Sequence, residues 1–343
     1  MILSKSNFGN KLLSNVNSIN ASFIKITKTC IFATDVITGA IYIGKFLNPL
    51  PSDFSLIASR EDFLHLMSLV DEVEIDEDGN YSSKNIKGKL NTNSEYNVYD
   101  GLVDSFDTTD MNSFKTTEEI VKSLKKTSVF TNPGDPNPSF RMANIKEHKS
   151  YSSSNYRMFL VDIAVDGEFL IGDEPLRFIL SEPNSTVYMN KSNTIVKTDN
   201  DEFCFRNNVN ATPLPMLEDK IKNTFDTLLN SNFFKISKEN LKTVVNFLSY
   251  YAKSSDNSVK NNGIIIEGDG SKINASVGIN SITLDVESVP TDSFKLPLSI
   301  DPIMTILSSI DSENYSIFYN DEIKIILIVT DKNDKIAISK VNI

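Results

Sequence analysis

The segment Phe54-Ser55-Leu56-Ile57-Ala58-Ser59 leads into Glu61-Asp62-Phe63-Leu64-His65-Leu66-Met67-Ser68-Leu69-Val70, and Glu72-Val73-Glu74-Ile75 follows. Apolar and polar residues alternate in 54–59 and 72–75, which predicts strands. The spacing of the apolar residues in 61–70 predicts a short helix. Two later stretches, 168–189 and 295–318, repeat this order, each with Asp or Glu near the start of the helix, where the helix dipole favours a negative charge. The repetition predicts one domain present in three copies.

A longer amphipathic helix introduces each copy. The apolar stripes are Phe8, Leu12, Val16 and Ile19; Ile120, Val121 and Leu124; and Leu241, Val244, Val245 and Leu248. They predict helices over 8–19, 117–126 and 237–253. Strands are expected at 23–26, 263–267 and 272–277, the last two flanking a turn at Asp269-Gly270. The expected fold class is α+β, with antiparallel sheets and helices in every copy.

The predicted domains are 1–104, 113–207 and 233–343. A linker at 208–232 contains Thr212-Pro213-Leu214-Pro215, which favours an extended chain, and a further helix at 218–229. The middle domain matches least well, because the loop at 132–138 has no counterpart in the other two. It is either a third copy or an insertion.

The bulk composition excludes several classes of protein. The net charge of −11 argues against a simple basic DNA-binding surface, although charge can be segregated between two faces. No apolar run is long enough to span a membrane, and the N-terminal sequence does not have the pattern of a signal peptide. Cys30 and Cys204 lie in strand-like runs and are expected to be reduced core thiols of a cytosolic protein.

The chain resembles the sliding-clamp superfamily, most closely the clamps of tailed bacteriophages. The resemblance lies in Leu3-Ser4-Lys5, Asn17-Ser18-Ile19-Asn20 and 68–80, and again in Phe234-Lys235-Ile236-Ser237 and 264–274. It implies a ring with helices lining a pore and sheets outside, which encircles duplex DNA and tethers a replicative DNA polymerase. The implied place of action is the cytoplasm of the infected host cell.

Phage clamps usually carry two domains and close as trimers, whereas bacterial clamps carry three and close as dimers. Three copies in this chain therefore favour a homodimer, and an inserted middle domain would leave a trimer. In either ring the subunits must contact one another head to tail and return to the first subunit, because head-to-tail contacts that do not close a ring produce filaments.

In such a ring, lysines on the pore helices would attract phosphates without reading sequence. The candidates on the polar faces of the predicted helices are Lys5, Lys11, Lys122, Lys125, Lys126, Lys238, Lys242 and Lys253. An ordinary solvated helix face is the competing interpretation for each one.

The same resemblance implies a clamp loader and partner peptides that bind an apolar surface pocket. Leu214 and Met216 in the linker and Val341 and Ile343 at the C-terminal end of the sequence are the candidates for that pocket. Simple packing of the linker is the alternative.

Catalysis is not expected. His65 lies within an apolar helix and His148 in a polar loop, and neither is near a nucleophile motif. Gly268-Asp269-Gly270-Ser271-Lys272 lies between two strands and lacks the spacing of a phosphate-binding loop. The sequence therefore predicts no enzyme, no metal site and no cofactor. A β-rich phage structural or assembly protein remains the alternative function.

Overall fold

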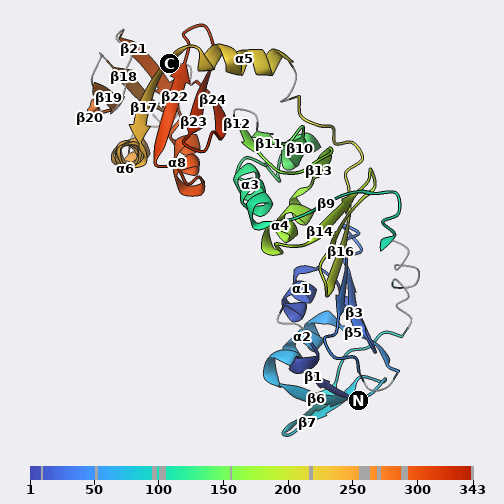
Figure 1. The fold of residues 1–343 in the computed structure, drawn as a ribbon. Helices are drawn as coiled ribbons and strands as arrows, with labels where there is room; N and C mark the ends of the chain where they lie inside the picture. Colours follow the sequence, from blue (N-terminus) through green and yellow to red (C-terminus); the bar gives the residue numbers. More distant parts are fainter. Residues whose placement is uncertain are drawn as a thin grey trace. The chain divides into compact units, whose positions relative to one another are not determined.

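The computed structural model describes residues 1–8, 11–50, 53–94, 99, 106–154, 157–215, 219–254, 263–268, 272–286 and 293–340. The chain forms two compact units, which Figure 1 shows coloured along the sequence. Unit 1 comprises Met1–Glu118 and Glu174–Val209, and unit 2 comprises Glu119–Asp173 and Asn210–Ile343. None of the helices in these described ranges is long and apolar enough to cross a membrane.

One order of elements occurs three times: a strand, a helix, four strands, a second helix and three strands. The first copy contains β1 (Ile2–Ser4), α1 (Leu12–Ser18), β2 (Phe23–Thr27), β3 (Cys30–Thr34), β4 (Ile41–Lys45), β5 (Ser55–Ser59), α2 (Arg60–Leu69), β6 (Glu72–Ile75), β7 (Asn80–Ser83) and β8 (Ile86–Lys89). The middle copy contains β9 (Asn112–Lys115), α3 (Glu118–Ser128), β10 (Ala143–Lys146), β11 (Lys149–Ser154), β12 (Arg157–Asp162), β13 (Phe169–Ile171), α4 (Asp173–Ser181), β14 (Thr186–Met189), β15 (Asn193–Lys197) and β16 (Asp201–Arg206). The third copy contains β17 (Asn232–Ser237), α6 (Lys238–Ser254), β18 (Ile264–Gly268), β19 (Lys272–Val277), β20 (Asn280–Asp285), β21 (Phe294–Leu298), α8 (Ile300–Ser309), β22 (Asn314–Tyr319), β23 (Ile325–Thr330) and β24 (Lys335–Ser339).

The sheets join neighbouring copies. We call the four strands between the two helices of a copy its inner set, and its other four strands its flanking set. The inner set of the first copy and the flanking set of the middle copy form one eight-stranded sheet, joined where β4 pairs with β16. A second eight-stranded sheet joins the middle and third copies in the same way, through β12 and β24. The flanking set of the first copy forms a four-stranded sheet with β8 at one edge. The inner set of the third copy forms another, with β20 at one edge.

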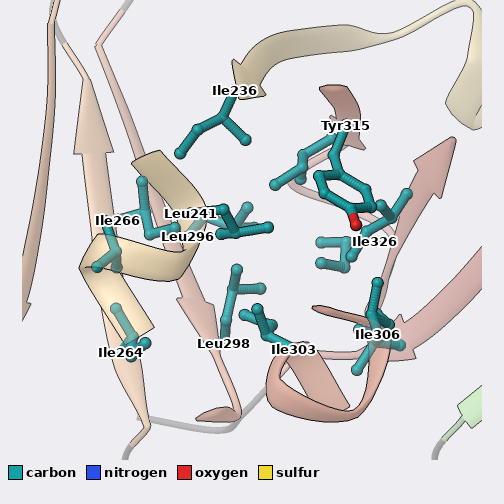
Figure 2. Packing of buried hydrophobic residues seen from close by; sticks show 14 of the residues in the cluster. Ile236, Leu241, Ile264, Ile266, Leu296, Leu298, Ile303, Ile306, Tyr315 and Ile326 are labelled. Carbon is teal, nitrogen blue, oxygen red and sulfur yellow. The ribbon is translucent and has the colours of Figure 1, made fainter. Parts of the chain in front are cut away.

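The core of unit 2 shows why the helices have one apolar stripe. Leu241, Val245 and Leu248 of α6 are at most 2% exposed, and they pack with Ile303 and Ile306 of α8. Figure 2 shows side chains from both helices and from the surrounding strands filling one apolar layer. The stripe predicted from the sequence is therefore the buried face of α6, and its polar face remains exposed.

The helix predicted over 8–19 is wrong at both ends. Ser4 caps a short 3-10 helix, η1 (Lys5–Asn7), and Asn7 caps it in return, so Phe8 is extended with φ −99° and ψ 144°. Ile19 is also extended and donates its amide to the Val16 carbonyl, which ends α1. Phe8 and Ile19 are nevertheless buried, so the apolar pattern marked the core correctly but overstated the length of the helix.

The other predicted elements are confirmed, including the strand, helix and strand in each of the three copies and the helices α3 and α6. The linker also contains the expected helix, α5 (Asp219–Leu229). The loop that distinguishes the middle copy includes the 3-10 helix η3 (Pro138–Arg141). The turn expected at Asp269-Gly270 lies outside the described residues, although the strands on either side of it are present.

The joint between β4 and β16 contains a short hydrogen bond, from the Tyr42 hydroxyl to the Asp201 carboxylate at 2.6 Å. We expect Tyr42→Phe to lower the free energy of unfolding by about 1–3 kcal/mol, because a partly buried carboxylate loses its donor. Burial, and then the nearby Asp201 charge, raises the pKa of Tyr42 well above its ordinary value of 10.0. Above about pH 10 the tyrosine ionises in the unfolded chain but stays protonated in the folded chain, so the free energy of unfolding falls as pH rises. The fall should be less steep in Tyr42→Phe, which has no hydroxyl to ionise at this position. Urea unfolding at pH 7 to 11 measures both effects. Tyr250→Phe, at an exposed position, should change neither.

Candidate nucleic-acid interface

The two helices that each copy contributes segregate their charges. Within the bounds that the structure gives α1, α2, α3, α4, α6 and α8, every Asp and Glu lies in the first three residues of its helix. There the acids complement the helix dipole. The charged residues beyond that first turn are Lys122, Lys125, Lys126, Arg177, Lys242 and Lys253, all basic. An acidic chain thus presents three helices, α3, α4 and α6, whose bodies carry positive charge.

On α3, Lys122 and Lys125 are exposed, but Lys126 is engaged elsewhere. The Lys126 ammonium lies 2.7 Å from the Asp334 carboxylate, with side-chain exposures of 20% and 3%. A nearly buried carboxylate needs a cation, so this lysine is held within unit 2. The structure therefore leaves Lys122 and Lys125 as the α3 candidates for binding phosphate.

On α6, Lys242 is exposed in the body of the helix. Lys238 is the first residue of the helix and lies 3.6 Å from Asp311, a contact between exposed side chains that contributes little. The side chain of Lys253 lies outside the described residues.

The two N-terminal candidates take part in ion pairs within unit 1. Lys5, in η1, lies 3.0 Å from Asp71. Lys11, just before α1, lies 2.8 Å from Glu182 and donates a hydrogen bond to the Ser181 carbonyl. Both remain predictions as DNA contacts, and their ion pairs compete with binding of phosphate.

Sequence reasoning did not single out Arg177, because it searched the helices for lysines. Arg177 is exposed on α4 and lines a cleft of about 440 Å³ together with Glu174, Ser14 and Ser181. Its position after the first turn of the helix, like that of Lys122 and Lys242, is the signal that would have found it.

The candidate peptide pocket is described only in part. Leu214 is 7% exposed and packs on Tyr151, with Phe140 and Met158 beside it. Its amide donates to Asn144 Oδ1 at 3.0 Å, which fixes the linker against the sheet of unit 2. Met216, Val341 and Ile343 lie outside the described residues. The position of Leu214 is thus that of a packed linker residue, and a role in peptide binding remains a prediction.

Nothing in the described part of the chain forms a group of three or more His, Cys, Asp and Glu that could hold a metal ion. Cys204 is buried, and burial raises the pKa of its thiol to about 11, which leaves it protonated at neutral pH. His65 is exposed on α2, and His148 lies in a turn at 3.5 Å from Asp166.

No protein-family model matches the sequence, and neither does any curated protein. Solved structures match over the whole chain. A Helicobacter pylori beta clamp bound to a DNA ligase peptide superposes with a TM-score of 0.77 at 12% identity, over 100% of this chain and 99% of that one. The DNA polymerase sliding clamp of Pseudomonas aeruginosa gives 0.78 at 10% identity, again over 100% and 99%. The DNA polymerase sliding clamp of Bacillus subtilis superposes with a TM-score of 0.74 at 12% identity, over 100% of this chain and 98% of that one.

The chain has the fold of a bacterial DNA polymerase sliding clamp. The expected α+β class, with clamp-type domains, is confirmed. The matched clamps are bacterial and of nearly the same length as this chain. The closer resemblance to phage clamps stays a prediction.

Proposed function

We propose that this protein is a non-enzymatic sliding clamp, which closes a ring around duplex DNA and tethers a DNA polymerase for processive synthesis. The observation that carries the proposal is the clamp fold over the full length of the chain. The confinement of acids to the first turns of the two helices in each copy supports it, because the bodies of α3, α4 and α6 then attract phosphate while the net charge is −11. The same full-length match favours this function over a phage structural protein.

We infer that two copies form the ring, each with three domains at about 1–104, 113–207 and 233–343. Each eight-stranded sheet joins an inner set to a flanking set, through β4 with β16 and through β12 with β24. By position in the repeat, β20 corresponds to β4 and β12, and β8 corresponds to β16 and β24. Antiparallel pairing of β20 of one copy with β8 of the next would complete a third such sheet at each of two joints.

A polymerase and a clamp loader are the proposed partners. The Helicobacter pylori clamp was solved with a DNA ligase peptide, which supports binding of partner peptides by this fold. For this chain, Leu214 and Met216 of the linker, with Val341 and Ile343, remain the proposed docking region. A bacteriophage source, and action in the cytoplasm of the infected cell, stay predictions from the sequence.

The proposal predicts topological retention on DNA. Native mass spectrometry should give a species of twice 38.3 kDa. With its loader, the protein should remain on nicked circular DNA through a wash at 0.5 M salt and leave within minutes of linearisation, because a ring slides off an end. It should also lengthen the products of the cognate polymerase. A strict monomer, or a filament, that never stimulates the polymerase would contradict the proposal.

A further inference from the structure

The linker helix α5 does not belong to the repeated domain. Of the α-helices in the described ranges, only α5 lies outside the order of elements that the three copies share. It precedes β17, the first strand of the third copy, whereas the described residues between β8 and β9 contain no α-helix. Building a copy of the domain therefore does not require α5, and its place on the surface needs another explanation.

The helix α5 covers the face of the second eight-stranded sheet that is turned away from α6 and α8. Its buried Phe225 and Leu228 pack with Leu327 of β23. The neighbours of Leu327 in the strand, Ile326 and Ile328, belong to the core that α6 and α8 complete. Successive side chains of a strand point to opposite faces, so α5 lies on the opposite side of the sheet from that core.

We call the apolar residues under and beside α5 the outer strip. They are Met158 and Leu160 of β12, Phe318 of β22, Ile325, Leu327 and Val329 of β23, and Ala337 of β24. Phe233 of β17 stacks on Phe318 with ring centroids 5.0 Å apart, and it is 40% exposed. Met158 and Leu160 also pack against the cluster that contains Leu214. The strip is thus continuous with the linker residue proposed for docking, and α5 leaves part of it open.

The attachment of α5 to the sheet depends on its apolar face. The ion pair between Lys222 and Glu147, at 3.4 Å, joins side chains that are 46% and 57% exposed, so it contributes little. A helix of 11 residues is only marginally stable in water without the surface on which it packs. Beyond its C-terminal end, Ser231 donates a hydrogen bond to the Tyr319 carbonyl at 2.8 Å, which anchors the chain there. An element held in this way opens locally at a lower cost than the core helices do.

The sequence of α5 shows which chemistry the outer strip accepts. Ile221, Phe225, Leu228 and Leu229 lie on one helix face, at positions i, i+4, i+7 and i+8. A segment of another protein with large apolar side chains at this spacing would offer the strip the same contacts.

We propose that α5 is an autoinhibitory segment, which occupies the outer strip in the free protein and leaves it when an amphipathic segment of the polymerase docks there. The inference rests on the proposed clamp function and adds how docking of the partner is regulated. Because the strip is open only in the fraction of molecules in which α5 has left it, the apparent affinity for the partner is reduced by that fraction.

The first test uses the full-length chain and the variant Phe225→Ser, Leu228→Ser, in which α5 loses its buried contacts. The matched control is Asn223→Ser, Thr227→Ser, on the exposed face of the same helix. The probe is a fluorescent peptide of residues 219–231, and circular dichroism checks that each protein is folded. By anisotropy, the first variant should bind the probe at least tenfold more tightly than the wild type and the control do.

The same proteins are then compared with the cognate polymerase and loader. Half-maximal lengthening of products should need at least fivefold less of the Phe225→Ser, Leu228→Ser variant than of the wild type, and the peptide should inhibit it. A wild type that never stimulates the polymerase would overturn the clamp function itself. If the wild type stimulates and the variant gains in only one assay, in neither, or loses stimulation, the role of α5 is overturned and the clamp function stands.

Hydrogen exchange of the wild type tests the same inference without a substitution. The amides of α5 should exchange faster than those of α6, and faster still when the polymerase is bound, because binding holds the helix off the strip. Exchange in α5 as slow as in α6, or slower exchange on binding of the polymerase, would overturn the proposal.

Discussion

The triple variant Lys122→Ala, Lys125→Ala, Lys242→Ala is expected to bind duplex DNA roughly two to three orders of magnitude more weakly near 0.1 M salt. The three side chains are exposed on the bodies of α3 and α6. Each lysine that neutralises a phosphate releases a counterion, and it contributes about 0.9 to the slope of log Kobs against log salt concentration. For each copy that contacts the DNA, loss of three such contacts should therefore reduce that slope by about 2.7.

Fluorescence anisotropy with a labelled duplex, titrated at several salt concentrations, measures the slope directly. The control is the triple variant Lys28→Ala, Lys272→Ala, Lys295→Ala. These lysines lie on strands or in strand turns, and they form ion pairs with Asp53, Asp285 and Glu267. The net charge changes equally in both triple variants, so only a difference between their slopes identifies the helix face as the DNA-binding surface. Equal slopes would contradict the assignment.

Local sequence patterns were sufficient to predict most of the helices and strands. The stripe Leu241, Val244, Val245 and Leu248 predicted α6 because a surface helix buries one face, and this face is the one that the strands and α8 cover. The repeated strand, helix and strand could also be found, since each copy buries its own apolar face. The first helix was overestimated because apolar spacing does not distinguish a helix from a short 3-10 turn followed by extended Phe8.

The pairing of sheets between copies could not be predicted in this way. Neither the β4–β16 nor the β12–β24 pairing is signalled by the residues of one strand alone. An eight-stranded sheet built from two copies depends on edges that meet only in the folded chain. The unmatched edges of β8 and β20 became visible for the same reason only once the strand order was known.

The prediction of Lys126 as a DNA-binding residue failed for a similar reason, because it depended on local sequence alone. Its spacing from Lys122 placed it on the polar side of the predicted helix, and sequence alone gave it the same role as its neighbours. Its partner, Asp334, is 208 residues away in sequence, and that contact reduces the exposure of the lysine to 20%. Helix periodicity reports which face a residue lies on, and it cannot report which distant group covers part of that face.

Lys126→Met is accordingly expected to lower the free energy of unfolding of unit 2 by about 3–5 kcal/mol, because it leaves Asp334, 3% exposed, without its cation. Urea denaturation monitored by circular dichroism measures the loss. Lys125→Met changes the exposed neighbour by the same chemistry and should remain within about 0.5 kcal/mol of the wild type.

The double variant Lys126→Met, Asp334→Asn removes both charges and should recover most of the loss, since a neutral amide is far less costly to bury than an unpaired carboxylate. A loss below about 1 kcal/mol in Lys126→Met would show that the ion pair contributes little to the stability of the joint between the middle and third copies. The same variant separates structure from DNA binding. Because the Lys126 ammonium is already neutralised by Asp334, its removal should leave the salt slope of DNA binding as in the wild type, whereas removal of Lys122 or Lys125 should reduce it.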